Sequence, residues 1–166
     1  MSTPTPSYEE LVHTTGRLFR WAGHAAEETR KANNKQAGKM LAIGIILYRG
    51  NKIALSERLS SVEFAGQIQG PGGKVDDTDS TLEQAAQREL IEETGIAVDR
   101  CRFHYITSVN QDSYAVAFFK LNVSTIEEPR NMEPHKHADW KWYTVEEALQ
   151  LNLMSGLRAA LETWRF

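Results

Sequence analysis

The apolar run at residues 41–48 is the strongest hydrophobic feature of the chain. Leu41-Ala-Ile-Gly-Ile-Ile-Leu-Tyr48 hardly alternates with polar residues, which is typical of a strand buried on both faces. A polar turn at 49–51 and a second apolar run at 52–56 follow directly. The pattern therefore predicts a buried strand that pairs back as a hairpin.

Further along the chain, apolar runs predict strands at 103–109 and 114–121 around a turn at 110–112. A short strand is expected at 140–143, where Trp140 and Trp142 would face opposite sides, so that at least one belongs to the core. Helical spacing predicts a helix that ends near Thr94, a helix that begins at Thr144, and a last helix over 155–164.

The first part of the chain has a pattern of its own. Residues 1–7 form a polar, proline-bearing tail, and residues 8–32 repeat apolar side chains at helical spacing. Residues 33–38 read as a linker. We expect an amphipathic helix here, which packs on its own domain or, alternatively, makes a homodimer contact.

Composition narrows the class of protein. A chain of 166 residues fits one domain with a full core. Its formal charge of −3 argues against a nucleic-acid or membrane-surface partner, whereas a small phosphorylated substrate stays compatible. The single Cys101 excludes an internal disulfide. No run is long enough to span a bilayer or typical of a signal peptide, so we expect a cytoplasmic protein.

The most informative feature is a helix with carboxylates on its inward side. Glu89, Glu92 and Glu93 stand at i, i+3 and i+4, beside the apolar stripe that begins at Leu82. Carboxylates so close repel one another unless the site protonates or holds a cation. All-oxygen ligation suits Mg²⁺ or Mn²⁺. The alternative is a solvated acidic helix end, which Arg88 and the preceding glycine turn disfavour.

The stretch from Gly73 to Ile96 resembles the signature of the Nudix hydrolases. The matching residues are Arg88, Glu89, Leu90, Glu92, Glu93, Gly95 and Ile96. The resemblance covers roughly residues 40–165 and implies an α/β/α sandwich around a mixed sheet, here with an extra N-terminal helix. It divides the chain into residues 1–39, the tail and amphipathic helix, and residues 40–166, the Nudix hydrolase domain. It also implies cleavage of a diphosphate bond, with the glutamates holding the metals.

One departure from the family pattern lies between Gly73 and Arg88. The family places a glutamate six residues after the glycine, where this chain has Asp79, and its arginine comes one residue sooner than Arg88. Compared with the family pattern, this turn has one extra residue and an aspartate in place of the glutamate. The conformation of the loop is therefore expected to differ from that of the family. Asp79 and Ser80 are helix N-cap candidates, and residues 80–83 fit a capping box. We do not assign Asp79 to the metal.

The resemblance suggests roles for the acidic helix. Glu89 and Glu93 hold the principal metal, and Glu92 binds a second metal or a metal-bound water. Arg88 orients a glutamate through a charge-assisted hydrogen bond. Glu92 is our first choice for the group that accepts the water's proton, only slightly ahead of Glu89 or a more distant acid such as Asp112.

Other residues are candidates for substrate binding. Gly72 and Gly73 permit close approach of the backbone, although an ordinary tight turn would need them too. Lys74 and Arg58 are phosphate candidates, and a solvent-facing side chain without a specific contact is the alternative for each.

The stretch from Glu128 to Lys136, followed by Trp140-Lys-Trp142, resembles the Nudix branch that acts on nucleoside triphosphates, including oxidised or methylated purine nucleotides. By that likeness Glu133 hydrogen-bonds a base edge, and an aromatic residue stacks on the ring. The candidates for stacking are Phe64, Tyr105 and Trp140. His135 and His137 alternate in a polar loop and more often face solvent than bind a metal.

These observations predict metal-dependent hydrolysis of a nucleoside triphosphate, including a modified or oxidised one, to the monophosphate and pyrophosphate. Hydrolysis of ADP-ribose or another nucleoside diphosphate derivative is the alternative within the family. A non-catalytic nucleotide sensor on the same fold is the alternative outside enzymes. Such sensors tend to lose signature glutamates, and this chain keeps all of them.

Overall fold

A computed structural model describes residues 40–110 and 114–164 of the chain. The predicted N-terminal tail, amphipathic helix and linker lie outside the described residues, and so does Asp112. The homodimer contact expected of that helix therefore stays a prediction.

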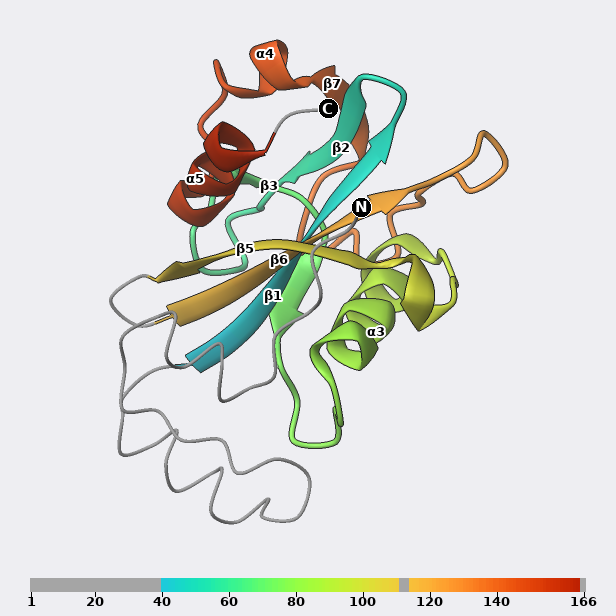
Figure 1. Cartoon of the computed structure of the whole chain (residues 1–166). Coiled ribbons are helices and arrows are strands. Elements are labelled where there is room, and N and C mark those ends of the chain that lie inside the picture. Colours follow the sequence, from blue (N-terminus) through green and yellow to red (C-terminus); the bar gives the residue numbers. More distant parts are fainter. Residues whose placement is uncertain (1–39, 111–113, 165–166) are drawn as a thin grey trace.

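The described residues form a mixed seven-stranded sheet (Figure 1). Its strands are β1 (Met40–Arg49), β2 (Lys52–Glu57), β3 (Ile68–Gln69), β4 (Gly72–Lys74), β5 (His104–Asn110), β6 (Tyr114–Asn122) and β7 (Lys141–Thr144). The strand β1 lies at the centre, where it pairs in parallel with β6 and antiparallel with β2 and β4. β3 and β7 both pair with β2, and β5 pairs with β6.

The central strand is buried on both faces, as its apolar run predicts. Leu41, Ile43, Ile45 and Leu47 belong to one core cluster, and Ile46 belongs to the other. The first cluster lies between the sheet and helix α3 (Leu82–Thr94), and the second between the sheet and helix α5 (Ser155–Thr163). Figure 1 shows these helices on opposite sides of the sheet, which confirms the sandwich.

Helix α3 begins one residue later than the sequence suggested. The N-cap is Thr81, whose hydroxyl accepts a hydrogen bond from the Gln84 backbone N–H at 3.0 Å, and not Asp79 or Ser80. Ser80 instead donates to the Gln84 side chain, and Asp79 is buried on another partner. The helix ends at Gly95, whose φ of 74° is the left-handed conformation that glycine adopts without strain.

The other predicted elements are confirmed with small shifts at their ends. The strand predicted at 103–109 begins at His104, because Phe103 still belongs to the short 3₁₀ turn η2 (Arg100–Arg102) as its C-cap. Thr144 caps helix α4 (Val145–Ala148) through a full capping box with Glu147. No helix among the described residues is long and apolar enough to cross a membrane.

The two tryptophans near β7 do not face opposite sides of the sheet. Trp140 lies just before the strand, so the alternation of strand side chains does not apply to it. Both Trp140 and Trp142 are partly buried against the same core cluster.

The packing of helix α3 gives a test of the layered fold. Leu90 is fully buried beneath the helix, whereas its neighbour Ile91 is 43% exposed on the other side. We expect Leu90→Ala to lower the free energy of unfolding by about 2–5 kcal/mol. The matched change Ile91→Ala should cost less than about 1 kcal/mol. Urea denaturation measures both, and equal losses would contradict the placement of the helix.

Candidate functional site

The glycine turn brings the backbone of β4 against the acidic helix. Gly73 pairs with Ile43 of β1, and a Cβ atom at Gly73 would lie 2.6 Å from the carboxyl group of Glu89. Any other residue would therefore displace that carboxyl group. The backbone N–H of Gly72 donates to Oε2 of Glu93 at 3.3 Å. Both glycines thus fix the position of carboxylates, beyond making a tight turn.

The glutamates of α3 differ sharply in exposure. Glu89 is 9% exposed and Glu93 is 8% exposed, so both carboxylates are buried against the sheet. The side chain of Glu92 is 50% exposed and lies at the edge of the cluster. The inward acidic stripe expected from the sequence is therefore present, with Glu92 as its solvent-facing member.

Arg88 joins the acidic residues into one hydrogen-bonded group. Its guanidinium donates to Oε1 of Glu89 at 2.9 Å and to Oε2 of Glu92 at 3.3 Å. It also donates to the backbone carbonyl of Lys74 at 3.0 Å, which ties the helix to β4. The contacts with the glutamates are those expected from the sequence, and the contact with Lys74 adds a link between helix and strand.

Asp79 receives the remaining side of the Arg88 guanidinium. Nε and Nη2 of Arg88 donate to the two carboxylate oxygens of Asp79 at 3.1 and 2.8 Å, a bidentate pair that leaves Asp79 only 3% exposed. The extra residue lies between Asp79 and Arg88, and the Asp76 N–H donates to Asp79 at 2.7 Å on the other side of the acid. The shorter acid thus reaches the arginine, and the loop remains closed.

Burial shifts the protonation of the two inner glutamates. Desolvation raises the pKa of Glu93 well above its usual value, and the neighbouring Glu89 raises it further. The pKa of Glu89 is also raised by burial, which outweighs the opposing effect of Arg88. The ionised form of these two carboxyl groups is therefore unfavourable without a counter-charge, and a nearby cation would stabilise it.

A further carboxylate reaches the cluster from the loop before β7. Glu133 lies close enough to raise the pKa of both Glu89 and Glu93, and it pairs with Lys136. The base-edge contact expected of Glu133 stays a prediction, and in the structure the residue lies near the acidic helix. No periodic pattern marks this contact, because it joins a loop to a helix end far away along the chain.

Backbone hydrogen bonds hold that loop on the end of α3. The Glu93 carbonyl accepts from the backbone N–H of Met132 at 3.3 Å and from the indole N–H of Trp140 at 3.2 Å. The Arg130 N–H donates to the Thr94 carbonyl at 3.0 Å. Carbonyls that a helix leaves unpaired at its C-terminus are thereby satisfied. Glu133 and Glu93 are consequently fixed relative to each other.

A cavity of about 450 Å³ opens on the other side of the glycine turn. Gly72, Gly73, Lys74 and Arg58 contribute to its lining, together with residues of β1, β6 and the start of α5. The volume suits a small-molecule ligand. Substrate-binding candidates from the sequence are thus brought together here, with the exception of Glu133.

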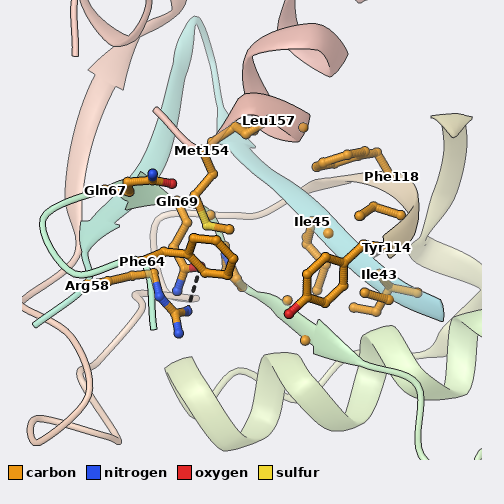
Figure 2. Close-up of a pocket in the computed structure, with 18 of the residues that line it drawn as sticks. Ile43, Ile45, Arg58, Phe64, Gln67, Gln69, Tyr114, Phe118, Met154 and Leu157 are labelled. Atoms are coloured by element: carbon orange, nitrogen blue, oxygen red, sulfur yellow. Dashed lines mark hydrogen bonds between the residues drawn. The ribbon is translucent and has the colours of Figure 1, made fainter. Parts of the chain in front are cut away.

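Of the aromatic residues considered for stacking, Phe64 lines this cavity (Figure 2). Tyr105 packs edge-on against Phe119 in the core, and Trp140 packs beside His137 and bonds to Glu93. The sequence did not single out Tyr114, whose ring lies 6.4 Å from that of Phe64 and also lines the cavity. Its position in β6 gave no signal, because aromatic residues are common in strands.

The two histidines of the loop have different environments. His135 is exposed, as expected for a polar loop. His137 is 3% exposed, and its Nδ1 lies 3.0 Å from both the Ser56 hydroxyl and the Ala138 carbonyl. Its Nε2 is buried without a hydrogen-bond partner among the described residues.

The acidic cluster fits a hard divalent cation that is shared with a substrate. Glu89 and Glu93 supply buried oxygen donors whose own repulsion favours a cation. No three acidic, histidine or cysteine side chains in the described segments converge tightly enough to enclose an ion by themselves. Water and phosphate oxygens would therefore complete the coordination, as is usual for Mg²⁺.

The Arg88–Asp79 pair should be worth measurable stability. Asp79→Asn leaves part of the guanidinium without its charged partner, and we expect the free energy of unfolding to fall by about 1–3 kcal/mol. Asp99→Asn removes the same charge from an exposed position whose side chain makes no cap hydrogen bond, and it should change stability by less than about 0.5 kcal/mol. Chemical denaturation at pH 7 compares the two, and similar losses would refute the role of Asp79.

The buried glutamates predict a pH dependence of stability in the absence of divalent ions. Both pKa values are higher in the folded than in the unfolded state, so above about pH 4.5 the folded protein keeps protons on these groups that the unfolded protein has released. The contribution of Glu89 and Glu93 to the free energy of unfolding is therefore fully present below about pH 4.5. It is lost as pH rises through their pKa values in the folded protein. In EDTA at pH 7, Glu93→Gln should therefore unfold at a higher denaturant concentration than wild type.

Glu92→Gln is the control for this effect. The Glu92 side chain is half exposed, so burial destabilises its charged form little. With Mg²⁺ at about 100 times its dissociation constant, wild type should gain about 2.7 kcal/mol, and Glu93→Gln should gain much less. A Glu93→Gln variant that is less stable than wild type in EDTA would contradict the burial argument.

Comparisons with known proteins identify similar sequences and structures. Two curated relatives are called 8-oxo-dGTP diphosphatase: one from Haemophilus influenzae is 41% identical over 75 residues, and one from Proteus vulgaris is 39% identical over 61 residues. These alignments cover 42% and 37% of this chain, and the chain spans about half the length, 54%, of each relative.

A crystal structure of a MutT NUDIX hydrolase from Burkholderia pseudomallei superposes with a TM-score of 0.65 at 30% identity, covering 75% of this chain and 97% of that one. Residues 38–164 match the family model of the NUDIX domain, a range that includes the glycine turn, helix α3 and the loop of Glu133. The fold, the acidic helix and this match agree, and the chain belongs to the Nudix hydrolase family.

Proposed function

We propose that this protein hydrolyses a nucleoside triphosphate to the monophosphate and pyrophosphate with the aid of Mg²⁺ or Mn²⁺. The observation that carries the proposal is the position of the Gly72–Gly73 turn. One side of it holds the buried carboxylates of Glu89 and Glu93, and the other side forms part of a cavity large enough for a nucleobase. A nucleotide spanning the turn would place its phosphates at the acidic cluster.

The relatives support a more specific substrate. Both curated matches carry the name 8-oxo-dGTP diphosphatase, which points to an oxidised deoxynucleotide. We therefore place modified purine deoxynucleoside triphosphates first among the substrates to be tested. ADP-ribose remains a comparison substrate within the same screen.

In the proposed mechanism Glu89 and Glu93 hold the principal metal ion. When bound, such an ion neutralises charge on the phosphate oxygens and lowers the pKa of an attacking water. Arg88 keeps Glu89 in place, and the Gly72 N–H does the same for Glu93. The protein thus supplies an arrangement that is fixed before the substrate arrives.

Proton transfer is assigned to the exposed edge of the cluster. Glu92 has solvent access, and the Arg88 guanidinium holds its carboxylate toward Glu89. In our proposal the oxygen of a water bonds to phosphorus, its proton passes to Glu92, and the bridging oxygen leaves with the other phosphate product. Its solvent access and its place beside the two inner glutamates support Glu92 as this base.

Glu133 takes a new role in this proposal. It lies near Glu89 and Glu93 and does not line the cavity, so we assign it to the metal side of the site and not to the base edge. Lys136 beside it provides a positive charge that lowers the repulsion within the cluster.

The proposal predicts that removal of the negative charge of Glu93 strongly lowers the rate of hydrolysis. Glu93→Gln should lower the rate of Mg²⁺-dependent pyrophosphate release by about a thousandfold or more, because it removes a buried metal ligand. Glu83→Gln, on the first turn of the same helix, should keep the rate within about twofold. A screen of ordinary and oxidised nucleoside triphosphates with ADP-ribose as comparison measures both variants.

The same screen separates hydrolysis from sensing. Tight nucleotide binding without turnover in Mg²⁺ or Mn²⁺ would overturn the proposal in favour of a sensor. Wild-type rates in a folded Glu93→Gln protein would overturn the metal assignment.

A further inference from the structure

The cavity beside the glycine turn has a polar end and an apolar wall. Figure 2 shows Phe118 and Leu157 on the apolar side, away from Arg58 and Gln69, which lie together at the other end. In such a cavity a flat ring can pack against the apolar wall, while the few polar groups hydrogen-bond to the edge of the ring. The chemistry of that polar end then decides which rings fit.

Arg58 determines which way the Gln69 amide faces. Its Nη1 lies 3.0 Å from Oε1 of Gln69, and its Nε donates to the Glu63 backbone carbonyl at 2.6 Å. A guanidinium has donors and no acceptor, so the amide atom that it contacts must be the oxygen. The amide is therefore held with its NH₂ group directed away from Arg58.

The NH₂ group of Gln69 is left as a donor. No side-chain or backbone acceptor in the described part of the chain bonds to it, and Gln69 lines the cavity. A ligand edge that carries an acceptor can accept a hydrogen bond from this NH₂ group. An amino group at the same edge is itself a donor and cannot. A donor fixed in this way favours a carbonyl oxygen over an exocyclic amine at the facing edge of a ligand.

The backbone at Phe64 holds its aromatic side chain at the cavity. Phe64 has a φ of 59°, a left-handed conformation that bulky residues rarely adopt, and its side chain remains 43% exposed. Its carbonyl accepts from the Gln67 N–H at 3.1 Å, which stabilises the turn. The strained turn places the aromatic ring at the cavity beside Tyr114.

We propose that Gln69, oriented by Arg58, selects nucleobases that present a keto oxygen over bases that present an amino group at the same edge. The proposal rests on the proposed function in that it takes the cavity as the base site of a nucleotide. Hypoxanthine and adenine are the most suitable pair of bases for a test. Hypoxanthine has a carbonyl oxygen at position 6 and a proton on N1, whereas adenine has an amino group at position 6 and no proton on N1.

Binding without metal tests the proposal independently of hydrolysis. Calorimetric titration in EDTA with inosine and adenosine monophosphates should show about tenfold tighter binding of the inosine nucleotide, the effect of one hydrogen bond. Gln69→Glu exchanges the donor for an acceptor and should reverse the preference. Gln69→Met removes the donor with little change in size and should make the two affinities equal within about twofold.

Gln67→Glu is the matched control, since it adds the same charge at another residue of the cavity lining. It should leave the ratio of the two affinities unchanged, even where both affinities fall. Equal binding of the two nucleotides by wild type, absence of binding by both, or an equal change of the ratio in the two glutamate variants would overturn the proposal.

Turnover distinguishes the failure of this proposal from that of the proposed function. Equal hydrolysis of inosine and adenosine triphosphates would refute the selection by Gln69 and leave the hydrolase proposal intact. An inosine preference in binding without release of pyrophosphate from any triphosphate would refute the hydrolase proposal and leave the base selection intact.

Discussion

The Arg88 guanidinium is the interaction on which the acidic site depends. It bonds to Asp79, Glu89, Glu92 and the carbonyl of Lys74, and so joins the turn before the helix, the helix itself and the glycine strand. Its charge opposes the repulsion among carboxylates that burial would otherwise make severe. A lysine would not replace it, because only the planar fork can reach several acceptors in fixed directions.

The inner glutamates illustrate the cost of a site prepared in advance. Glu93 is buried beside Glu89 and Glu133, and its raised pKa reflects the unfavourable environment of the charged form. The remainder of the fold supplies the stability that this arrangement removes, mainly through the two apolar clusters on either side of β1. In the proposed mechanism a bound cation would offset these unfavourable electrostatics.

Local patterns made the helix and much of the sheet predictable. The spacing of Glu89, Glu92 and Glu93 fixes their relative directions whatever surrounds the helix, and the apolar run of β1 indicates burial on both faces. The position of Glu133 could not be predicted in this way, since it depends on Met132 and Trp140 meeting one carbonyl at the end of α3. The N-cap was misplaced because Asp79 has the residue type of a cap, but its carboxylate is occupied by Arg88.

The cavity and the acidic cluster belong to different layers of the sandwich. Helix α3 carries the glutamates, whereas β6 and the start of α5 carry the apolar wall on the opposite side of the sheet. The short segment from Gly72 to Lys74 lines the cavity and also contacts the acidic residues and Arg88. If the cavity holds the base as proposed, substitutions at Met154 or Leu157 would change which ligands fit without touching the acidic helix, and such a scaffold could acquire new specificities independently of its chemistry.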